Sequence, residues 1–500
     1  MADAPPAAAP AEDPQPANHA DGRRTALWLF VLSAALRLIP VALTAGLGIG
    51  LDDMFQYDML GRSLAAGDGF RWYAPNDLSQ ILAAIEAYAG VDLASVELPT
   101  DPRGMLTSFR APLYPAFLGL VYATFGLANR FLAARSLQAL LGATLAPLAF
   151  AIAGQLGANL RFARAAGLVT AAWPMLVALP LGLATETLFL PALAGGTWLL
   201  LRSERSSSLP PSWLAGLLLA LATLTRSVIA GFPLLAAIRA WRTGRRHAAI
   251  ALLVPLVALA TPWVIRNSLL HQRLTLIESS LGYNLYLGYH PQGTGTFLFG
   301  PSLDLLTILD DAERDTVGRQ QALAFMRQDP GRLPSLVALK WGHFWGLEDR
   351  IFTFLYSNGF FGRWPPTLVL SALALLSLPL VVVLPLAIFG WAVSPRDPPW
   401  QILSLLLAWY IGVHLLIMAE ERFHLALVPM LTALAARGLT IGGAFLSRLR
   451  AGEASARRRA LLAAGLTLLV VGPWALEIFA GLDRYALLTS ADGWQAGLPY

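Results

Sequence analysis

Long apolar stretches alternate with short basic loops along most of the chain. Many of the stretches approach the roughly 20 residues that a helix needs to cross a bilayer. The loops between them carry clusters of arginine, and short cytoplasmic loops of membrane proteins are enriched in Arg and Lys. Placing every cluster inside predicts spans at residues 25–46, 131–155, 165–182, 186–202, 247–266, 366–392, 400–418, 424–446 and 460–480, with two short spans inside 212–241.

This arrangement predicts 11 spans, with the N-terminus in the cytoplasm. The short pair inside 212–241 must meet near Arg226, because arginine clusters flank it on both sides. Residues 1–24 are rich in Ala and Pro and predict a disordered cytoplasmic tail. Residues 481–500 become an extracytoplasmic C-terminal tail.

Two long polar segments, residues 47–130 and 267–365, then form the extracytoplasmic regions of the domain 25–480. Within the first, the apolar run 111–126 is short and contains prolines, so we expect a helix that lies along the outer membrane surface. The Trp-containing segment 335–352 predicts a second surface helix, since Trp favours the membrane interface.

Composition strengthens the membrane assignment. Hydrophobic residues make up 56% of the chain and charged residues 13%, and the mean hydropathy is +0.57. So few charges do not cover the surface of a soluble protein, and the pattern indicates an all-α polytopic membrane protein. The net charge of +5 follows from the arginine loops, so it does not indicate a nucleic-acid partner. The chain has no cysteine, which excludes disulfides and thiolate metal sites.

An acidic pair, Asp52 and Asp53, follows the first apolar segment at the predicted outer rim of the membrane. A carboxylate at that depth is costly and therefore points to function. Asp53 and Tyr57 are four residues apart and share one face of a helix. Asp52 is explained equally well as a helix N-cap. The pair also offers the carboxylate oxygens that a divalent metal prefers, although nothing in the sequence requires a metal.

Further charged residues fall on the predicted outer face. Arg110, Arg226 and Arg266 have the planar guanidinium that binds phosphate in a bidentate manner. The simpler alternative for an arginine at this depth is an interface anchor. Glu186 is a second acidic residue, although a glutamate at a helix start is favourable without any function.

The segment 281–297 is rich in glycine and aromatic residues and predicts a loop that binds a sugar by stacking and hydrogen bonds. Its polar and aromatic side chains include Tyr283, Asn284, Tyr286 and His290. An ordinary aromatic belt at the membrane interface is the alternative. His343, Glu348 and Asp349 fit no metal-ligand spacing, and the chain has no phosphate-binding loop or dinucleotide fingerprint.

Taken together, these segments resemble the GT-C membrane glycosyltransferases of the protein O-mannosyltransferase and lipid A aminoarabinose transferase superfamily. The similarity runs from residue 25 to about residue 440, in the order of the family. The matching stretches are Asp53–Tyr57, Arg110–Pro115, Thr185–Phe189, Pro262–Asn267, Gly282–Gly288 and Arg422–Pro429.

The resemblance implies a GT-C helical bundle and a polyprenyl-phosphate-linked sugar donor. The family's acidic residue maps to Asp53 and its basic residue before Pro-Leu to Arg110. Phe109 stands where many relatives have a second acid, so the second carboxylate is unassigned, with Asp52 and Glu186 as candidates. The segment around Tyr283 is expected to lie near the sugar and phosphate.

We therefore predict an inverting hexosyl- or pentosyltransferase in a bacterial inner membrane, with its active site outside. Asp53 is the expected general base on the acceptor hydroxyl. Arg110, Arg266 and Arg226 are expected to bind the donor phosphate. The acceptor is a glycan, a lipid or a protein. A lipid or glycolipid flippase is the alternative, although the charges gather at one face rather than at the bilayer midplane.

Overall fold

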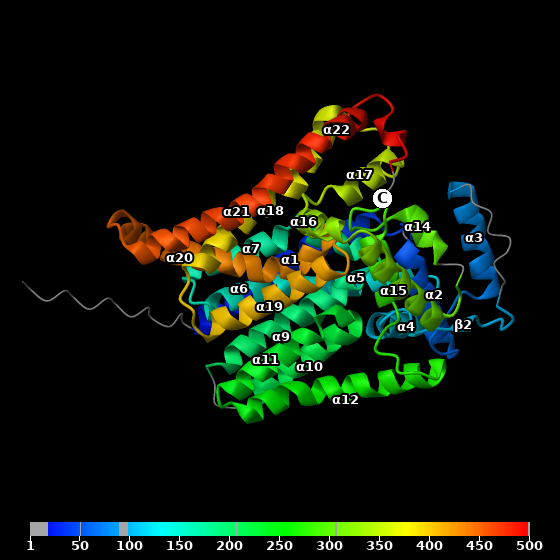
Figure 1. The fold of residues 1–500 in the computed structure, drawn as a ribbon, viewed down its shortest axis with the longest axis horizontal. Coiled ribbons are helices and arrows are strands. Elements are labelled where there is room, and N and C mark those ends of the chain that lie inside the picture. The colour runs from blue at the N-terminus through cyan, green and yellow to red at the C-terminus, as the bar shows by residue number, and fades with distance from the viewer. Residues whose placement is uncertain (1–18, 51, 90–98, 206–208, 306–307, 499–500) are drawn as a thin grey trace, which may run out of the picture.

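The computed structural model describes residues 19–50, 52–89, 99–205, 209–305 and 308–498. These residues form a bundle of long helices, with shorter helices grouped at one end (Figure 1). Every segment predicted to span the membrane folds as helix, so the prediction of an all-α polytopic membrane protein is confirmed.

Among the described residues, seven stretches are long and apolar enough to cross a membrane. They are α1 (His19–Leu43), α5 with α6 (Arg130–Ala143 and Leu145–Gln155), α12 (Arg246–His271), α18 (Pro366–Val393), α19 (Pro398–Leu416), η4 with α20 (Glu421–Leu427 and Val428–Arg450) and α21 (Ala454–Ala480).

An eighth stretch is broken. Helix α7 (Leu160–Ala172) is followed by α8 (Pro174–Ala178) and η1 (Leu179–Leu181), with a bend of 53° between them. Trp173 at the break has an extended backbone. Because a residue before proline is pushed out of the helical region, Pro174 explains the position of the bend.

The other three predicted spans fold as helices that are shorter or less apolar. They are α9 (Glu186–Ser203), α10 (Pro210–Thr225) and α11 (Gly231–Arg242). Helix α10 ends directly before Arg226, whose backbone is extended, and η2 (Ser227–Ile229) leads into α11. The expected meeting of two short helices at Arg226 is therefore confirmed. The length and composition of the described helices support seven or eight of the 11 predicted spans.

The first outer region gathers at one end of the bundle (Figure 1). The expected surface helix is present as α4, while its position relative to a membrane stays a prediction. Strands β1 and β2 pair antiparallel, with Arg71 opposite Leu106. The elements are α2 (Asp52–Ala66), β1 (Arg71–Trp72), α3 (Pro75–Ala89), β2 (Met105–Leu106) and α4 (Leu113–Phe125).

The second outer region is also helical, and two expectations about it were wrong. The segment 281–297 is a helix over more than half its length rather than a loop, and 335–352 is two helices rather than one. The break between them, residues 345–349, contains Glu348, whose left-handed φ of 61° lies outside helical geometry. The elements are α13 (Leu281–Tyr289), α14 (Phe299–Asp304), α15 (Asp311–Gln328), η3 (Pro330–Arg332), α16 (Leu333–Phe344) and α17 (Arg350–Ser357).

Both predicted tails are partly helical. Helix α1 already begins at His19, and residues 1–18 of the expected N-terminal tail lie outside the described residues. The C-terminal segment contains α22 (Leu482–Leu488) and η5 (Gly493–Gln495). Leu488 is fully buried in a cluster with side chains of α17 and α18, so this tail packs on the second outer region.

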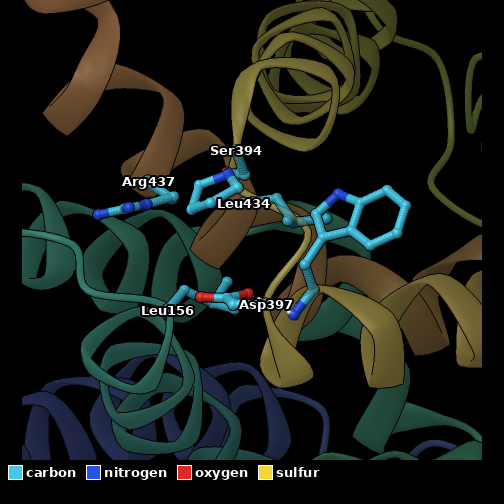
Figure 2. A pocket seen from close by; sticks show the side chains of 7 residues that line it. Leu156, Ser394, Asp397, Leu434 and Arg437 are labelled. Carbon is cyan, nitrogen blue, oxygen red and sulfur yellow. Dashed lines mark hydrogen bonds between the residues drawn. The ribbon is translucent and has the colours of Figure 1, made fainter.

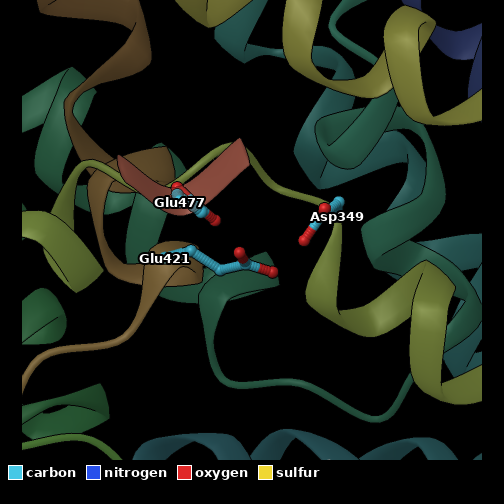
Figure 3. Close-up of side chains that lie close together, drawn as sticks. All are labelled: Asp349, Glu421 and Glu477. Atoms are coloured by element: carbon cyan, nitrogen blue, oxygen red, sulfur yellow. The ribbon is translucent and has the colours of Figure 1, made fainter. Parts of the chain in front are cut away.

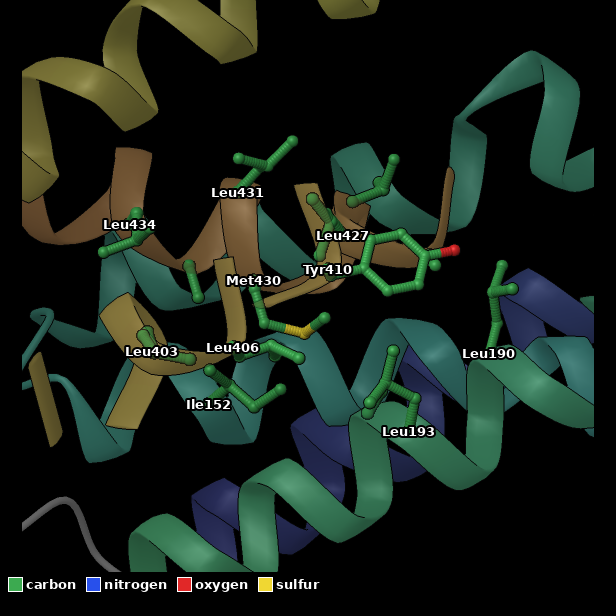
Figure 4. Close-up of a cluster of buried hydrophobic side chains, with 14 of the residues drawn as sticks. Ile152, Leu190, Leu193, Leu403, Leu406, Tyr410, Leu427, Met430, Leu431 and Leu434 are labelled. Carbon is green, nitrogen blue, oxygen red and sulfur yellow. The ribbon is translucent and has the colours of Figure 1, made fainter. Parts of the chain in front are cut away.

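Helix α20 forms the centre of the bundle. In its membrane-spanning stretch, 72% of the most apolar window is buried inside the protein, against 17% for α21. Met430 and Leu431 of α20 pack with apolar side chains of α6, α9 and α19 (Figure 4). The outer end of α20 continues directly into η4, so residues of η4 are anchored by the core below them.

Candidate functional site

Asp53 lies in the first turn of α2, and its side chain is 35% exposed. Tyr57 lies one turn further on and is buried, with its ring 5.0 Å from that of Tyr114 in an edge-on arrangement. The carboxylate is therefore open to a ligand while the tyrosine below it is fixed by packing. The side chain of Asp52 lies outside the described residues, so its auxiliary role stays a prediction.

Arg110 connects the loop before α4 to α2. Its Nη2 donates a hydrogen bond to Oδ1 of Asp53, and its Nε and Nη2 donate to Oε1 of Gln56, at 2.9 and 2.7 Å. The guanidinium also lies over the rings of Tyr57 and Phe109, 5.2 and 5.1 Å from their centroids. These contacts hold a planar cation beside the predicted base.

A second arginine reaches Asp53 from the opposite end of the chain. Arg422 lies on η4, and its Nη2 is 3.6 Å from Oδ2 of Asp53. The sequence alone assigns no role to this residue. The signal was present, since Arg422 opens the last of the family-like stretches, but the sequence does not show which face of η4 turns toward α2.

Arg226 and Glu186 form the neighbouring ion pair. Nη1 of Arg226 donates to Oε1 of Glu186 at 2.6 Å, and Glu186 is buried at the start of α9. Arg226 acts electrostatically on Asp53, and Arg422 acts on Glu186. The structure thus brings together one group, which we call the arginine-rich cluster: Asp53, Arg110, Glu186, Arg226 and Arg422.

The balance of charge in this cluster favours anions. Three guanidinium groups face two carboxylates, and the carboxylate oxygens of Asp53 turn toward Arg110 and Arg422. Burial raises the pKa of Asp53, but the two arginines outweigh it and hold the pKa below its ordinary value. This arrangement favours an anion over a further cation at Asp53. Because the Asp52 side chain lies outside the described residues, a divalent metal at the acidic pair stays a prediction.

Tyr57 has the opposite response to the same surroundings. Burial, opposed by Arg110, raises the pKa of Tyr57 to about 12. The phenol therefore stays protonated at neutral pH and has a hydrogen to donate.

The structure does not bring Arg266 to Asp53 through any contact among the described residues. Nη1 of Arg266 donates to the Thr107 carbonyl at 2.5 Å and to Oδ1 of Asn267 at 2.9 Å. Its guanidinium lies 4.9 Å from the ring centroid of Trp263. Arg266 therefore hydrogen-bonds to the backbone of the loop that carries Arg110, and its predicted binding of phosphate has no geometric support.

The predicted sugar-binding residues lie on α13 and divide into two groups. Tyr283 packs edge-on against Phe109, with ring centroids 5.6 Å apart, and so adjoins the arginine-rich cluster. Asn284 continues the helix from there. The Tyr286 hydroxyl donates to Asp304 at 2.8 Å, and its ring contacts that of His290 at 5.2 Å. Tyr286 and His290 therefore face the neighbouring outer helices.

Three carboxylates form a separate acidic cluster behind η4, and they point toward one another (Figure 3). Asp349, Glu421 and Glu477 each have an oxygen within 4.8 Å of the others. Asp349 is paired with Arg484 at 3.0 Å, whereas Glu421 and Glu477 form no ion pair with a described residue. Hard divalent cations prefer such all-oxygen sets. Of the residues rejected as metal ligands from their spacing, Asp349 belongs to this cluster.

A small pocket lies between the end of α18, the start of α19 and α20 (Figure 2). Leu156, Leu434 and Trp400 line it together with Asp397 and Arg437. It contains none of the residues of either charged cluster, and the predicted topology places it at the cytoplasmic ends of the helices.

No model of a known protein family matches the chain, and no curated protein matches it. Among solved structures, the chain is similar to ArnT from Cupriavidus metallidurans bound to undecaprenyl phosphate. The TM-score is 0.47 at 12% identity, over 96% of this chain and 76% of that one.

The Archaeoglobus fulgidus oligosaccharyltransferase in complex with zinc and sulfate also has a TM-score of 0.47, at 15% identity, over 95% of this chain and 54% of that one. Its apo form gives the same TM-score at 14% identity, over 96% and 56% of the two chains. The chain thus spans about half the length of the archaeal protein.

Proposed function

We propose that this protein transfers a sugar from a polyprenyl-phosphate-linked donor to an acceptor hydroxyl, with inversion, at the outer face of a bacterial cytoplasmic membrane. The observation that carries the proposal is the surplus of positive charge around a carboxylate that a ligand can reach. Arg110 and Arg422 come from distant segments and converge on Asp53, with Arg226 close by. Such a site binds an anion and keeps a proton acceptor beside it.

The donor phosphate would take over the guanidinium groups. Arg110 and Arg422 now share Asp53, and the oxygens of a phosphate accept charge-assisted hydrogen bonds of the same kind from them. The same contacts stabilise the charge that grows on the leaving phosphate as the glycosidic bond breaks. Tyr57 supplies a protonated hydroxyl close to this position.

Asp53 would then act as general base. As the acceptor oxygen attacks the anomeric carbon, its proton passes to the Asp53 carboxylate, and the bond from that carbon to the phosphate oxygen breaks. Attack from the face opposite the phosphate inverts the configuration. Because the phosphate is a good leaving group, one carboxylate suffices, unlike the acid and base pair of glycosidases.

The change of partners also explains how a carboxylate with a lowered pKa accepts a proton. While Asp53 is paired with two arginines, its pKa lies below the ordinary value. Once the anionic phosphodiester of the donor takes those arginines as partners, the same carboxylate loses its cations and lies beside a negative group, which raises its affinity for a proton. Donor binding would therefore activate the base.

The test uses purified full-length protein with polyprenyl-phosphate sugars extracted from bacterial membranes. Mass spectrometry follows the release of polyprenyl phosphate and the appearance of a new glycoside on added membrane acceptors. The proposal expects both products in equal amounts. Movement of labelled donor across a vesicle membrane with no new glycosidic bond would show a flippase instead.

A further inference from the structure

The residues before Arg110 form a short irregular segment, Thr107–Phe109, which we call the anchor segment. It follows β2, and Thr107 still donates its backbone N–H to Phe70 at 3.2 Å. All three of its residues are buried. Because the direction of this backbone sets where the guanidinium of Arg110 lies, whatever fixes the segment also positions that cation.

Asp311, the first residue of α15, holds two consecutive residues of the anchor segment. Its Oδ2 accepts the hydroxyl of Thr107 at 2.5 Å and the backbone N–H of Ser108 at 2.8 Å. Its side chain is 2% exposed. These bonds span more than 200 positions of sequence and join the second outer region to the first.

The other oxygen of Asp311 is held by Arg314. Nη1 of Arg314 donates to Oδ1 at 3.1 Å, and its Nε donates to the carbonyls of Leu305 and Ile308 at 3.2 and 2.9 Å. The Arg314 guanidinium also lies 5.1 Å from the ring centroid of Phe109. Phe109 thus has Arg314 on one side and, at the same distance, Arg110.

Burying the charges of Asp311 and Arg314 is energetically unfavourable, which is unusual for a purely structural contact. Removing both charges of an ion pair from water costs several kcal/mol per ion, so a buried pair adds little net stability. Burial raises the pKa of Asp311 despite Arg314 and the two hydrogen bonds, which shows that these contacts do not fully offset the desolvation. A geometric role accounts for keeping the charge there.

Helix α12 holds the same segment from another side. Arg266 donates to the Thr107 carbonyl at 2.5 Å, and the Ser108 hydroxyl lies 2.7 Å from Nε2 of His271. The loop after α12 adds the backbone N–H of Ser279, which donates to the Ser108 carbonyl at 2.9 Å. The anchor segment is therefore held by α12, by this loop and by α15.

We propose that Asp311 is a positioning residue that, through Thr107 and Ser108, sets the place of Arg110 in the donor-phosphate site. The inference rests on the proposed function. It assigns Asp311 no contact with the substrate, and its effect reaches the reaction only through Arg110.

The test compares Asp311→Asn with Asp329→Asn. Asp329 follows the other end of α15 and caps η3 by accepting the N–H of Arg332, a role that asparagine fills equally well. In Asp311→Asn the amide nitrogen turns a donor toward either Arg314 or the anchor segment. We expect donor KM to rise about 10- to 100-fold, as for a catalytic group displaced by about 1 Å. Asp329→Asn should leave KM unchanged.

A double-mutant cycle separates positioning from general damage. In an Arg110→Ala background, Asp311→Asn should add little, because the residue it positions is gone. Equal fold-losses in both backgrounds would overturn the proposal. So would an unchanged KM in Asp311→Asn.

Amide hydrogen exchange gives a readout that does not depend on the reaction. Backbone exchange at residues 107–110 should be faster in Asp311→Asn than in Asp329→Asn and wild type. If wild type shows no sugar transfer but exchange changes as expected, the proposed function fails while the anchoring by Asp311 stands. Unchanged exchange means that Asp311 does not hold the segment.

Discussion

Two charged clusters lie on either side of η4, and consecutive residues of η4 contribute a side chain to each. Arg422 faces Asp53 in the arginine-rich cluster, whereas Glu421 faces Asp349 and Glu477 in the acidic cluster. Both clusters contain carboxylates drawn from distant parts of the chain. They differ in what surrounds those carboxylates.

The cation partners of these carboxylates, rather than the carboxylates themselves, therefore decide which chemistry each site suits. In the arginine-rich cluster every carboxylate is paired and positive charge is in excess, which suits a phosphate. In the acidic cluster Arg484 pairs with Asp349, and the other two carboxylates form no ion pair with a described residue. That cluster suits protons or a hard cation.

Removing the proposed general base, Asp53, should have the largest effect on activity. We expect Asp53→Asn to lower kcat for sugar transfer about 10²- to 10⁴-fold, the range typical of general-base catalysis. Asp77→Asn is the matched control, because Asp77 lies in the same outer region and, among the described residues, forms its one ion pair with Arg62. A loss under threefold in Asp53→Asn would remove Asp53 as the base.

Removing an arginine should weaken donor binding more than it slows chemistry. We expect Arg422→Ala to raise donor KM about 10- to 100-fold, since a hydrogen bond to a charged group contributes about 1.5–3 kcal/mol. Arg103→Ala serves as control, because Arg103 is exposed and pairs with Asp101. If donor KM is the same in Arg422→Ala and wild type, the structure has placed Arg422 beside Asp53 for another reason.

How far the sequence predicted these regions depends on the range of the interactions. The spans and the meeting of helices at Arg226 follow from local apolar pattern and arginine loops, and the structure has them as helices. The i and i+4 spacing of Asp53 and Tyr57 was equally local. The approach of Arg422 to Asp53 depends on how η4 packs on α2, which no local pattern encodes.

Helix α13 shows a second kind of limit. Gly282 and Gly288 made the segment look like a loop, yet both serve close packing. A Cβ on Gly282 would lie 1.8 Å from the Asp315 carbonyl oxygen, and one on Gly288 would lie 2.0 Å from that of Ile417. The two glycines suggested a break in the helix, whereas in the structure they let neighbouring backbone approach α13 closely.

A substitution in the acidic cluster should have a smaller effect, and that effect should be a gain in stability rather than a loss of activity. We expect Glu477→Gln to raise stability by at least about 1 kcal/mol and leave sugar transfer unchanged, because like charges about 4 Å apart repel by about 1 kcal/mol even at the dielectric constant of water. Thermal unfolding of the purified protein measures it, with the exposed Glu313→Gln as control. If Mg²⁺ or Ca²⁺ raises the unfolding temperature of wild type but not of Glu477→Gln, a cation occupies the acidic cluster. The protein then has a cation site in addition to the anion site at Asp53.

The smallest expected effect is on the pH dependence of stability, and it tests whether Asp53 is ionised in the folded protein. Its pKa is lowered in the folded protein, so its ion pairs stabilise the fold above the unfolded pKa of about 3.9. That stabilisation is lost as pH falls through the folded pKa. The difference in unfolding temperature between wild type and Asp53→Asn should therefore stay constant from pH 8 down to about pH 5 and shrink only below about pH 4. A difference that already shrinks near pH 6 would mean that the arginines do not hold Asp53 ionised, and the anion-binding character of the cluster would lose its basis.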